Sequence, residues 1–113
     1  MGNRAMIMSK NRYDYAKCVD NVMVPVVYIH WADRDEVEGW LQRMKEEGFR
    51  NFTSDPSYAL ARLCQIACED YPNGRNVGIM AINPNEDPAE YFLDEGYWIV
   101  DGYEIVETVY PHY

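Results

Sequence analysis

The sequence predicts an α+β domain with two layers, in which two helices pack on one face of a mainly antiparallel sheet in the order β-α-α-β-β-β. Three observations predict this class: two apolar, β-branched runs typical of strands, two stretches with helical spacing between them, and a C-terminal pair of strands around an Asp-Gly turn. A chain of 113 residues suits one domain. We assign it to residues 13–113 and expect residues 1–12 to form a flexible N-terminal tail.

The first half of the predicted domain is a strand followed by two helices. Residues 24–31 are apolar on both faces, which is typical of a buried strand. Asp33 is the expected N-cap of a helix, because apolar residues recur on one helical face over residues 37–44. Asp55 and Pro56 predict the N-cap and first position of a second helix.

The second half is predicted to contain only strands and a loop. Residues 76–83 form a second apolar run, which we expect to be a buried strand. An acidic loop over residues 84–96 follows, with a helical turn expected after Pro88. The pair Asp101-Gly102 predicts a type I′ hairpin turn between the last two strands.

Charge is distributed unevenly along the chain. The net charge is -9, and residues 76–113 hold eight acidic residues with no lysine or arginine. This charge argues against nucleic acid or an anionic membrane as a partner, because affinity for phosphate depends on clustered basic residues. The asymmetry predicts an acidic face on the C-terminal third that binds a basic protein. The alternative is a solvated surface that keeps the protein soluble.

Tyrosines and a tryptophan lie among these acidic residues, and such side chains are favoured anchors in protein interfaces. About half of them are expected to fill the core of the sheet instead. The predicted partner-binding residues are Glu86, Asp87, Glu90, Tyr91, Asp94, Glu95, Tyr103, Glu104 and Glu107.

The cysteine count and the N-terminal sequence favour a cytoplasmic location. Three cysteines, Cys18, Cys64 and Cys68, are an odd number without paired spacing, so we expect reduced, buried thiols. No signal sequence or membrane-spanning run is recognised. No complete set of metal ligands is found, and no cofactor is expected.

One polar constellation resembles a ligand site. His30 is expected at the end of a central strand, where ligands often bind in sheet proteins. Tyr58, Arg62 and Gln65 share one face of the second helix, and if that face meets His30 the group could hold a phosphate or a carboxylate. The alternative is that His30 and Arg62 are structural, satisfied by neighbouring backbone and carboxylate groups.

Three segments carry a resemblance to a known group of proteins: a strand ending His30-Trp31, the helix start Asp55-Pro56-Ser57-Tyr58 followed by Arg62, and the strand at Val77-Gly78-Ile79. In these segments the chain resembles a family of small, uncharacterised proteins of tailed phages and prophages. Family members often have a glycine shortly after His-Trp, where this chain has Ala32 and Asp33. The resemblance implies a phage or mobile-element origin and no particular reaction.

Three hypotheses follow from these observations. The first is a non-enzymatic, phage-type protein that binds and inhibits a basic host protein through its acidic, tyrosine-rich face, in an anti-defence or host-takeover role. The second is a small-ligand or nucleotide-binding module, with or without enzymatic activity, centred on His30 and Arg62. The third is an assembly protein whose sheet edges pair to form a homodimer.

Overall fold

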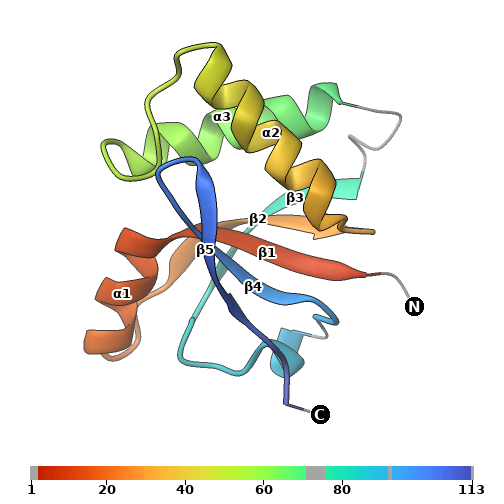
Figure 1. Cartoon of the computed structure of the whole chain (residues 1–113). Helices are drawn as coiled ribbons and strands as arrows, with labels where there is room; N and C mark the ends of the chain where they lie inside the picture. The colour runs from red at the N-terminus through yellow and green to blue at the C-terminus, as the bar shows by residue number, and fades with distance from the viewer. Residues whose placement is uncertain (1–2, 71–75, 92, 113) are drawn as a thin grey trace.

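The computed structural model describes residues 3–70, 76–91 and 93–112, and it confirms the α+β class (Figure 1). This part of the chain contains three α-helices, a short 3-10 helix and a five-stranded mixed sheet. The elements are β1 (Arg4–Ser9), α1 (Lys10–Cys18), β2 (Val24–His30), α2 (Arg34–Glu46), α3 (Pro56–Glu69), β3 (Val77–Ile82), η2 (Pro88–Tyr91), β4 (Gly96–Asp101) and β5 (Glu104–Val109).

The sheet has the strand order β3-β2-β1-β4-β5. Three neighbouring pairs are antiparallel, and the central pair of β1 and β4 is parallel, with Ala5 opposite Gly96 and Ile7 opposite Trp98. The parallel pair brings the beginning of β1 beside the beginning of β4. Residues at the two ends of the sequence therefore meet at one end of the sheet.

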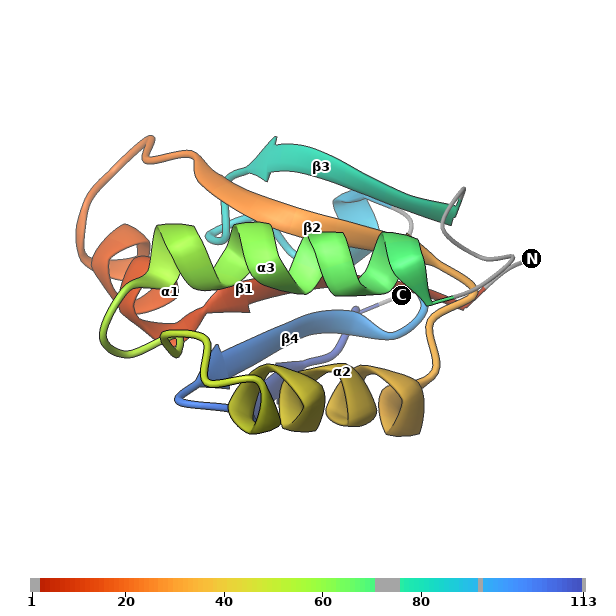
Figure 2. The same cartoon turned by 90° about the horizontal axis from the view of Figure 1, so that it is seen from above.

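Alternating strand residues divide the core into two clusters. The first cluster joins Ile7, Val27 and Trp98 to the apolar faces of α2 and α3. The second cluster joins Met6, Val26 and Tyr97 to α1 and to the segment that contains Leu93. Both faces of the central strands are therefore covered, and Figure 2 shows α2 and α3 lying along the sheet.

The predicted flexible tail over residues 1–12 is wrong for the residues that the structure describes. Residues 5–8 of β1 are fully buried at the centre of the sheet, and Ser9 caps α1 by accepting a hydrogen bond from the Arg12 backbone N–H. The run Ala-Met-Ile-Met is apolar on both faces, as expected for a central strand with helices and loops on either side.

The predicted β-α-α-β-β-β order therefore lacks its first strand and first helix. α1 occupies most of residues 13–22, a segment to which the predicted order assigned no element. Only Tyr13 and Ala16 of this helix are buried, and both pack in the second cluster. Because α1 packs on the second cluster, on the opposite face of the sheet from α2 and α3, the predicted two-layer arrangement is too simple.

The predicted starts of the two longer helices are confirmed. Asp33 caps α2 by accepting from the Asp35 backbone N–H, and Asp55 caps α3 by accepting from the Tyr58 backbone N–H. Pro56 occupies the first helical position of α3, where a missing N–H costs nothing. The loop between the helices contributes Phe52, which is fully buried in the first cluster.

Two strand predictions need correction. β3 was expected to be buried, but it is an edge strand and Ile79 is 58% exposed. The hairpin turn is shifted by one residue, because β4 includes Asp101 and the loop is Gly102-Tyr103. Gly102 has a φ of 60° and Tyr103 is not in the positive-φ region, which is the pattern of a type II′ turn with glycine first.

Candidate functional site at the strand ends

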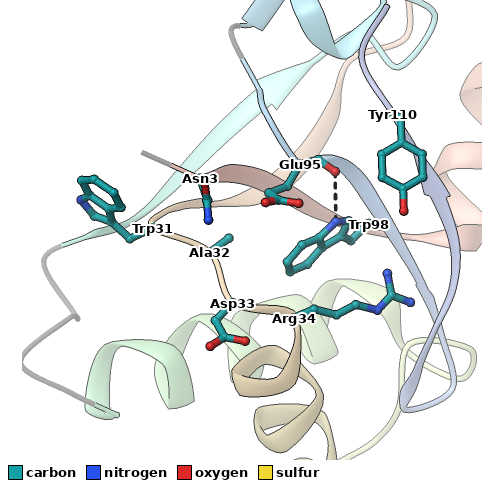
Figure 3. A pocket seen from close by; sticks show the side chains of 8 residues that line it. All are labelled: Asn3, Trp31, Ala32, Asp33, Arg34, Glu95, Trp98 and Tyr110. Carbon is teal, nitrogen blue, oxygen red and sulfur yellow. Dashed lines mark hydrogen bonds between the residues drawn. The ribbon is translucent and has the colours of Figure 1, made fainter. Parts of the chain in front are cut away.

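A pocket of about 470 Å³ opens at the end of the sheet where β2 ends and where β1, α2 and β4 begin (Figure 3). It combines aromatic side chains with charged and polar ones, and they come from four separate segments of the chain. Its lining residues are Asn3, Trp31, Ala32, Asp33, Arg34, Glu95, Trp98 and Tyr110.

Trp31 stands at one side of this pocket in an unfavourable backbone conformation. Its φ is 63°, in the left-handed region that a bulky residue rarely adopts, and its side chain is 57% exposed. The conformation is held by the Ala32 backbone N–H, which donates to the Asn3 carbonyl oxygen at 2.6 Å, and by stacking of the indole on the His30 ring at 5.1 Å. Strain of this kind is concentrated at functional sites.

Tyr110 stands on the opposite side of the pocket, and it is 64% exposed (Figure 3). Between the two exposed rings lies Trp98, which is buried and donates from its indole N–H to the Glu95 carbonyl oxygen at 3.1 Å. Trp98 therefore forms the floor of the pocket, and the exposed rings of Trp31 and Tyr110 form two of its sides. Tryptophan and tyrosine are residue types that often anchor protein interfaces.

The charged groups of the pocket differ in their interaction partners. The Arg34 guanidinium donates to Thr108 at 2.9 Å and to Glu38 at 3.2 Å, and it lies over the Trp98 ring at 6.0 Å. By contrast, the half-buried Glu95 carboxylate has neither a hydrogen bond nor an ion pair with any residue that the structure describes. Glu95 is the unpaired charge of the pocket.

Further acidic groups lie next to the pocket where α2 begins. Burial and the neighbouring carboxylates of Asp70 and Asp33 raise the pKa of Glu36. Asp70 also accepts a hydrogen bond from the Trp40 indole N–H at 2.5 Å, which fixes the end of α3 against α2. The lining of the pocket itself carries two carboxylates, Asp33 and Glu95, and one guanidinium, Arg34.

The structure does not bring His30 together with the polar face of α3. Ile29 points into the first core cluster with α3, so His30, its neighbour along β2, lies on the opposite face of the sheet. Arg62 lies on α3 and therefore on the other face from His30. The predicted site that combines these two residues is wrong.

The predicted ligand residues of α3 have structural partners of their own. The Tyr58 ring is contacted by the guanidinium groups of Arg50 at 4.3 Å and Arg62 at 5.4 Å, and Gln65 donates to Glu69 at 3.0 Å. Of these contacts, the one between Arg50 and Tyr58 ties α3 to the loop that precedes it. Arg62 forms no ion pair with a described residue and its Nε is buried without a hydrogen-bond partner, so the predicted pairing of Arg62 with a carboxylate is not found.

The predicted partner-binding residues are spread over the molecule instead of forming one face. Tyr103 belongs to the first cluster, and its hydroxyl donates to the Phe49 carbonyl oxygen. Tyr91 packs in the second cluster, and its hydroxyl accepts from the Asn83 backbone N–H. Glu104 lies in the hairpin at the far end of the sheet from Glu95. The others are exposed or half-buried and lie on β5 or between β3 and β4, namely Glu86, Asp87, Glu90, Asp94 and Glu107.

Asp87 anchors the segment that carries Tyr110. Its carboxylate accepts from the backbone N–H groups of His112 and Ala89, both at 2.9 Å, and lies 2.5 Å from the His112 ring nitrogen Nδ1. These hydrogen bonds, first that from the His112 backbone, lower the pKa of Asp87 to about 2. Asp87 therefore holds one wall of the pocket through its charged form.

Acid is expected to release this anchor. Because the pKa of Asp87 is lower in the folded state, its stabilising effect is complete above its ordinary value of 3.8 and is lost as the pH falls through about 2. The free energy of unfolding, measured with urea, should differ between the unchanged protein and Asp87→Asn at neutral pH. The two values should converge near pH 2. Glu90→Gln, a change in the same turn, should follow the unchanged protein at every pH, and a constant difference for Asp87→Asn would contradict the assignment.

Three further findings concern metal ligands, membrane spans and cysteines. Within residues 3–70, 76–91 and 93–112, no group of three potential ligands is placed to hold a metal ion. No described helix is long and apolar enough to cross a bilayer. The three cysteines, Cys18, Cys64 and Cys68, form no disulfide bond. Cys18 and Cys68 are exposed, so the prediction of buried cysteines is wrong for those two. Burial, followed by the neighbouring Cys68, raises the pKa of Cys64.

Comparisons with known proteins provide no further assignment. No family model matches the chain, and neither the curated proteins nor the solved structures contain a match. The resemblance to phage proteins therefore stays a prediction from the residues alone.

Of the pocket residues, sequence analysis selected only Glu95 as part of a binding site. Asn3 was missed because the N-terminal segment was interpreted as a tail. Trp31 and Asp33 were noticed only as the end of a strand and the cap of a helix. The sequence signal for the pocket was the His-Trp pair, because a tryptophan directly after a buried strand leaves a large apolar side chain outside the sheet.

Proposed function

We propose that this chain is a non-enzymatic binding protein whose strand-end pocket receives a basic side chain of a protein partner. Supporting this, Glu95 offers an unpaired carboxylate, Trp31 and Tyr110 offer exposed rings, and Asp33 adds a second carboxylate to the lining. An arginine or lysine side chain combines an apolar stem with a cationic head, so it would contact the rings along its length and Glu95 at its end.

The observation that carries this proposal is Trp31. An exposed indole in the left-handed region costs conformational energy and gains little from burial, so the folded chain alone does not explain it. Contact with a partner would cover this indole and would offset that cost. Tryptophan is among the residues most often found to dominate the energy of protein interfaces.

The biological setting of the proposal comes from the resemblance to phage proteins. In that setting the partner would be a basic host protein, and binding would inhibit it, in an anti-defence or host-takeover role. The acidic character of the chain, with its net charge of -9, suits a surface that competes with nucleic acid for such a protein.

Binding of short peptides tests the pocket directly. We expect a peptide with a central arginine to bind, and the same peptide with glutamate in that place to fail, in titrations followed by NMR. Trp31→Asn should weaken binding by about tenfold or more. Asparagine tolerates the left-handed region, so the free energy of unfolding should change by less than about 1 kcal/mol.

Charge variants distinguish the pocket from a diffuse acidic surface. Glu95→Gln should weaken binding of the arginine peptide and reduce the salt dependence of that binding. Glu104→Gln, at the far end of the sheet, should change neither the affinity nor its salt dependence. Equal losses for the two variants would contradict the pocket and favour a general charge effect. Capture from a host lysate with the protein and with Trp31→Asn would then identify partners that depend on the pocket.

A further inference from the structure

The outer edge of β3 is open and apolar. β3 is the last strand on its side of the sheet, so no described strand pairs with its second edge (Figure 2). Ile79 is exposed on one face of the sheet and Met80 on the other. Edge strands are commonly protected by a charged residue or a proline, and the sequence of β3, VGIMAI, contains neither. An edge of this kind is typical of a strand that pairs with another chain.

The hydrogen bonds of the neighbouring strands show which backbone groups of β3 are open. The Arg4 carbonyl oxygen accepts from the Glu95 backbone N–H at 2.9 Å, so the backbone groups of Arg4 point to β4 and those of Ala5 point to β2. This alternation continues through the registers of β1 with β2 and of β2 with β3. The residues of β3 that bond to β2 are therefore Gly78, Met80 and Ile82. The residues whose N–H and C=O groups point outward are Val77, Ile79 and Ala81.

A second copy of β3 matches these open groups. When two copies pair antiparallel about a two-fold axis at Ile79, this residue lies opposite itself, and Val77 lies opposite Ala81 of the second copy. The three residues then exchange hydrogen bonds with their counterparts. The same register places Met80 opposite Gly78 of the second copy, on the same face of the sheet.

The surface beside Gly78 has space for this methionine. A pocket of about 240 Å³ opens there, and Tyr28, His30, Asn76, Val77 and Gly78 line it. A Cβ at Gly78 would have only the Tyr28 ring, at 3.9 Å, as a neighbour. Methionine is flexible, and its sulfur makes favourable contacts with aromatic rings. Met80 of one copy therefore fits the pocket of the other, and the fit is reciprocal.

The distribution of charge also favours a second copy at this edge. Each copy has a net charge of -9, but residues 21–32 and 76–85, which include β2 and β3, contain no lysine, arginine, aspartate or glutamate. Two acidic chains therefore meet with little local repulsion along β3. The other edge strand, β5, carries Glu104 and Glu107, and like charges brought opposite one another would oppose pairing there.

We propose that the protein forms a two-fold symmetric homodimer through the outer edges of β3, with Ile79 opposite Ile79 and with Met80 of each copy in the pocket beside Gly78 of the other. The result is a continuous sheet of both copies. No residue of β3 lines the strand-end pocket, so the dimer leaves the pocket of each copy unchanged.

The molar mass in solution tests the dimer. Sedimentation equilibrium over about 1 to 100 µM should show association of the unchanged protein. Ile79→Lys adds a charge at the axis, and Gly78→Val fills the seat of Met80 without adding charge. Each should raise the dissociation constant of the dimer by about tenfold or more.

Val106→Lys is the matched control. Val106 is an exposed apolar residue of the other edge strand, and its replacement changes the net charge by the same amount as Ile79→Lys. This variant should keep the dissociation constant of the unchanged protein. Its behaviour separates loss of the β3 edge from a general effect of the added lysine.

Amide hydrogen exchange identifies the edge residue by residue. Exchange at the outward amides of Val77, Ile79 and Ala81 should slow as the protein concentration rises. The amides of Gly78 and Met80 bond to β2 and should be protected at every concentration. Gly78→Val should leave the outward amides unprotected at concentrations where those of the unchanged protein are protected.

The dimer at this edge is disproved if the protein is a monomer at about 100 µM with unprotected outward amides, a result that would leave the edge to a strand of a different protein. It is also disproved if Val106→Lys dissociates the dimer as fully as Ile79→Lys. Added salt should tighten the dimer by screening repulsion between two acidic copies, whereas it should weaken binding of the arginine peptide. Failure of one proposal is therefore recognised separately from failure of the other.

Discussion

Gly96→Ala is expected to destabilise the domain by about 4 kcal/mol or more. Gly96 begins β4 with a φ of 83°, and a Cβ there would lie 2.0 Å from the Val109 carbonyl oxygen and 2.9 Å from its carbonyl carbon. Those atoms belong to the backbone of the neighbouring strand and cannot move without separating β5 from β4. The substitution therefore adds a backbone clash to the cost of a left-handed alanine.

The same substitution at Gly39 is the matched control. Gly39 lies in the middle of α2, where a Cβ would meet nothing within 4 Å, and alanine is the better helix former. We expect Gly39→Ala to stabilise the protein by about 0.5–1 kcal/mol. Urea unfolding measures the free energy of unfolding of both variants. If the value for Gly96→Ala lay within about 1 kcal/mol of that of the unchanged protein, β4 and β5 would separate at little cost.

The helical part of the fold was predictable because its signals are local. The N-caps Asp33 and Asp55 and the proline at the start of α3 are recognised within a few residues, and each determines where a helix begins. The hairpin was found one residue out of place, since Asp101-Gly102 and Gly102-Tyr103 both contain the glycine that the turn needs. The local pattern does not distinguish the two turn types.

The central strand was missed for a physical reason as well. β1 has few β-branched residues, and basic residues occur both within it and in the helix that follows, which is typical of a solvated terminus. Its environment is set by β2 and β4, which pair with its two edges, and β4 begins more than eighty residues further along the chain. The continuous apolar run of residues 5–8 was the available signal.

The candidate pocket was beyond sequence analysis because it depends on the parallel pairing of β1 with β4. That pairing brings Asn3 beside Glu95 and Trp98, although more than ninety residues separate them in the chain. The register of β1 with β2 likewise places Arg4 opposite His30. Sequence analysis could not find this neighbour of His30, because it had removed residues 1–12 from the domain.

Removal of the first seven residues is therefore expected to abolish the fold. A chain that begins at Met8 lacks residues 4–7, which pair with both β2 and β4 and whose apolar side chains lie in both core clusters. Loss of the central strand should exceed about 5 kcal/mol, the lower end of the stability of natural domains. A flexible tail, in contrast, could be removed with no effect on unfolding.

Circular dichroism and NMR should show no cooperative unfolding and no dispersed amide signals for the chain that begins at Met8. Ile7→Val provides a graded control, since it removes one buried methylene from the same strand and should cost about 0.5–1.5 kcal/mol while the fold is kept. If the shortened chain still unfolded cooperatively, β1 would not be the centre of the sheet. The pocket would then lose its basis, because Asn3 belongs to the segment removed.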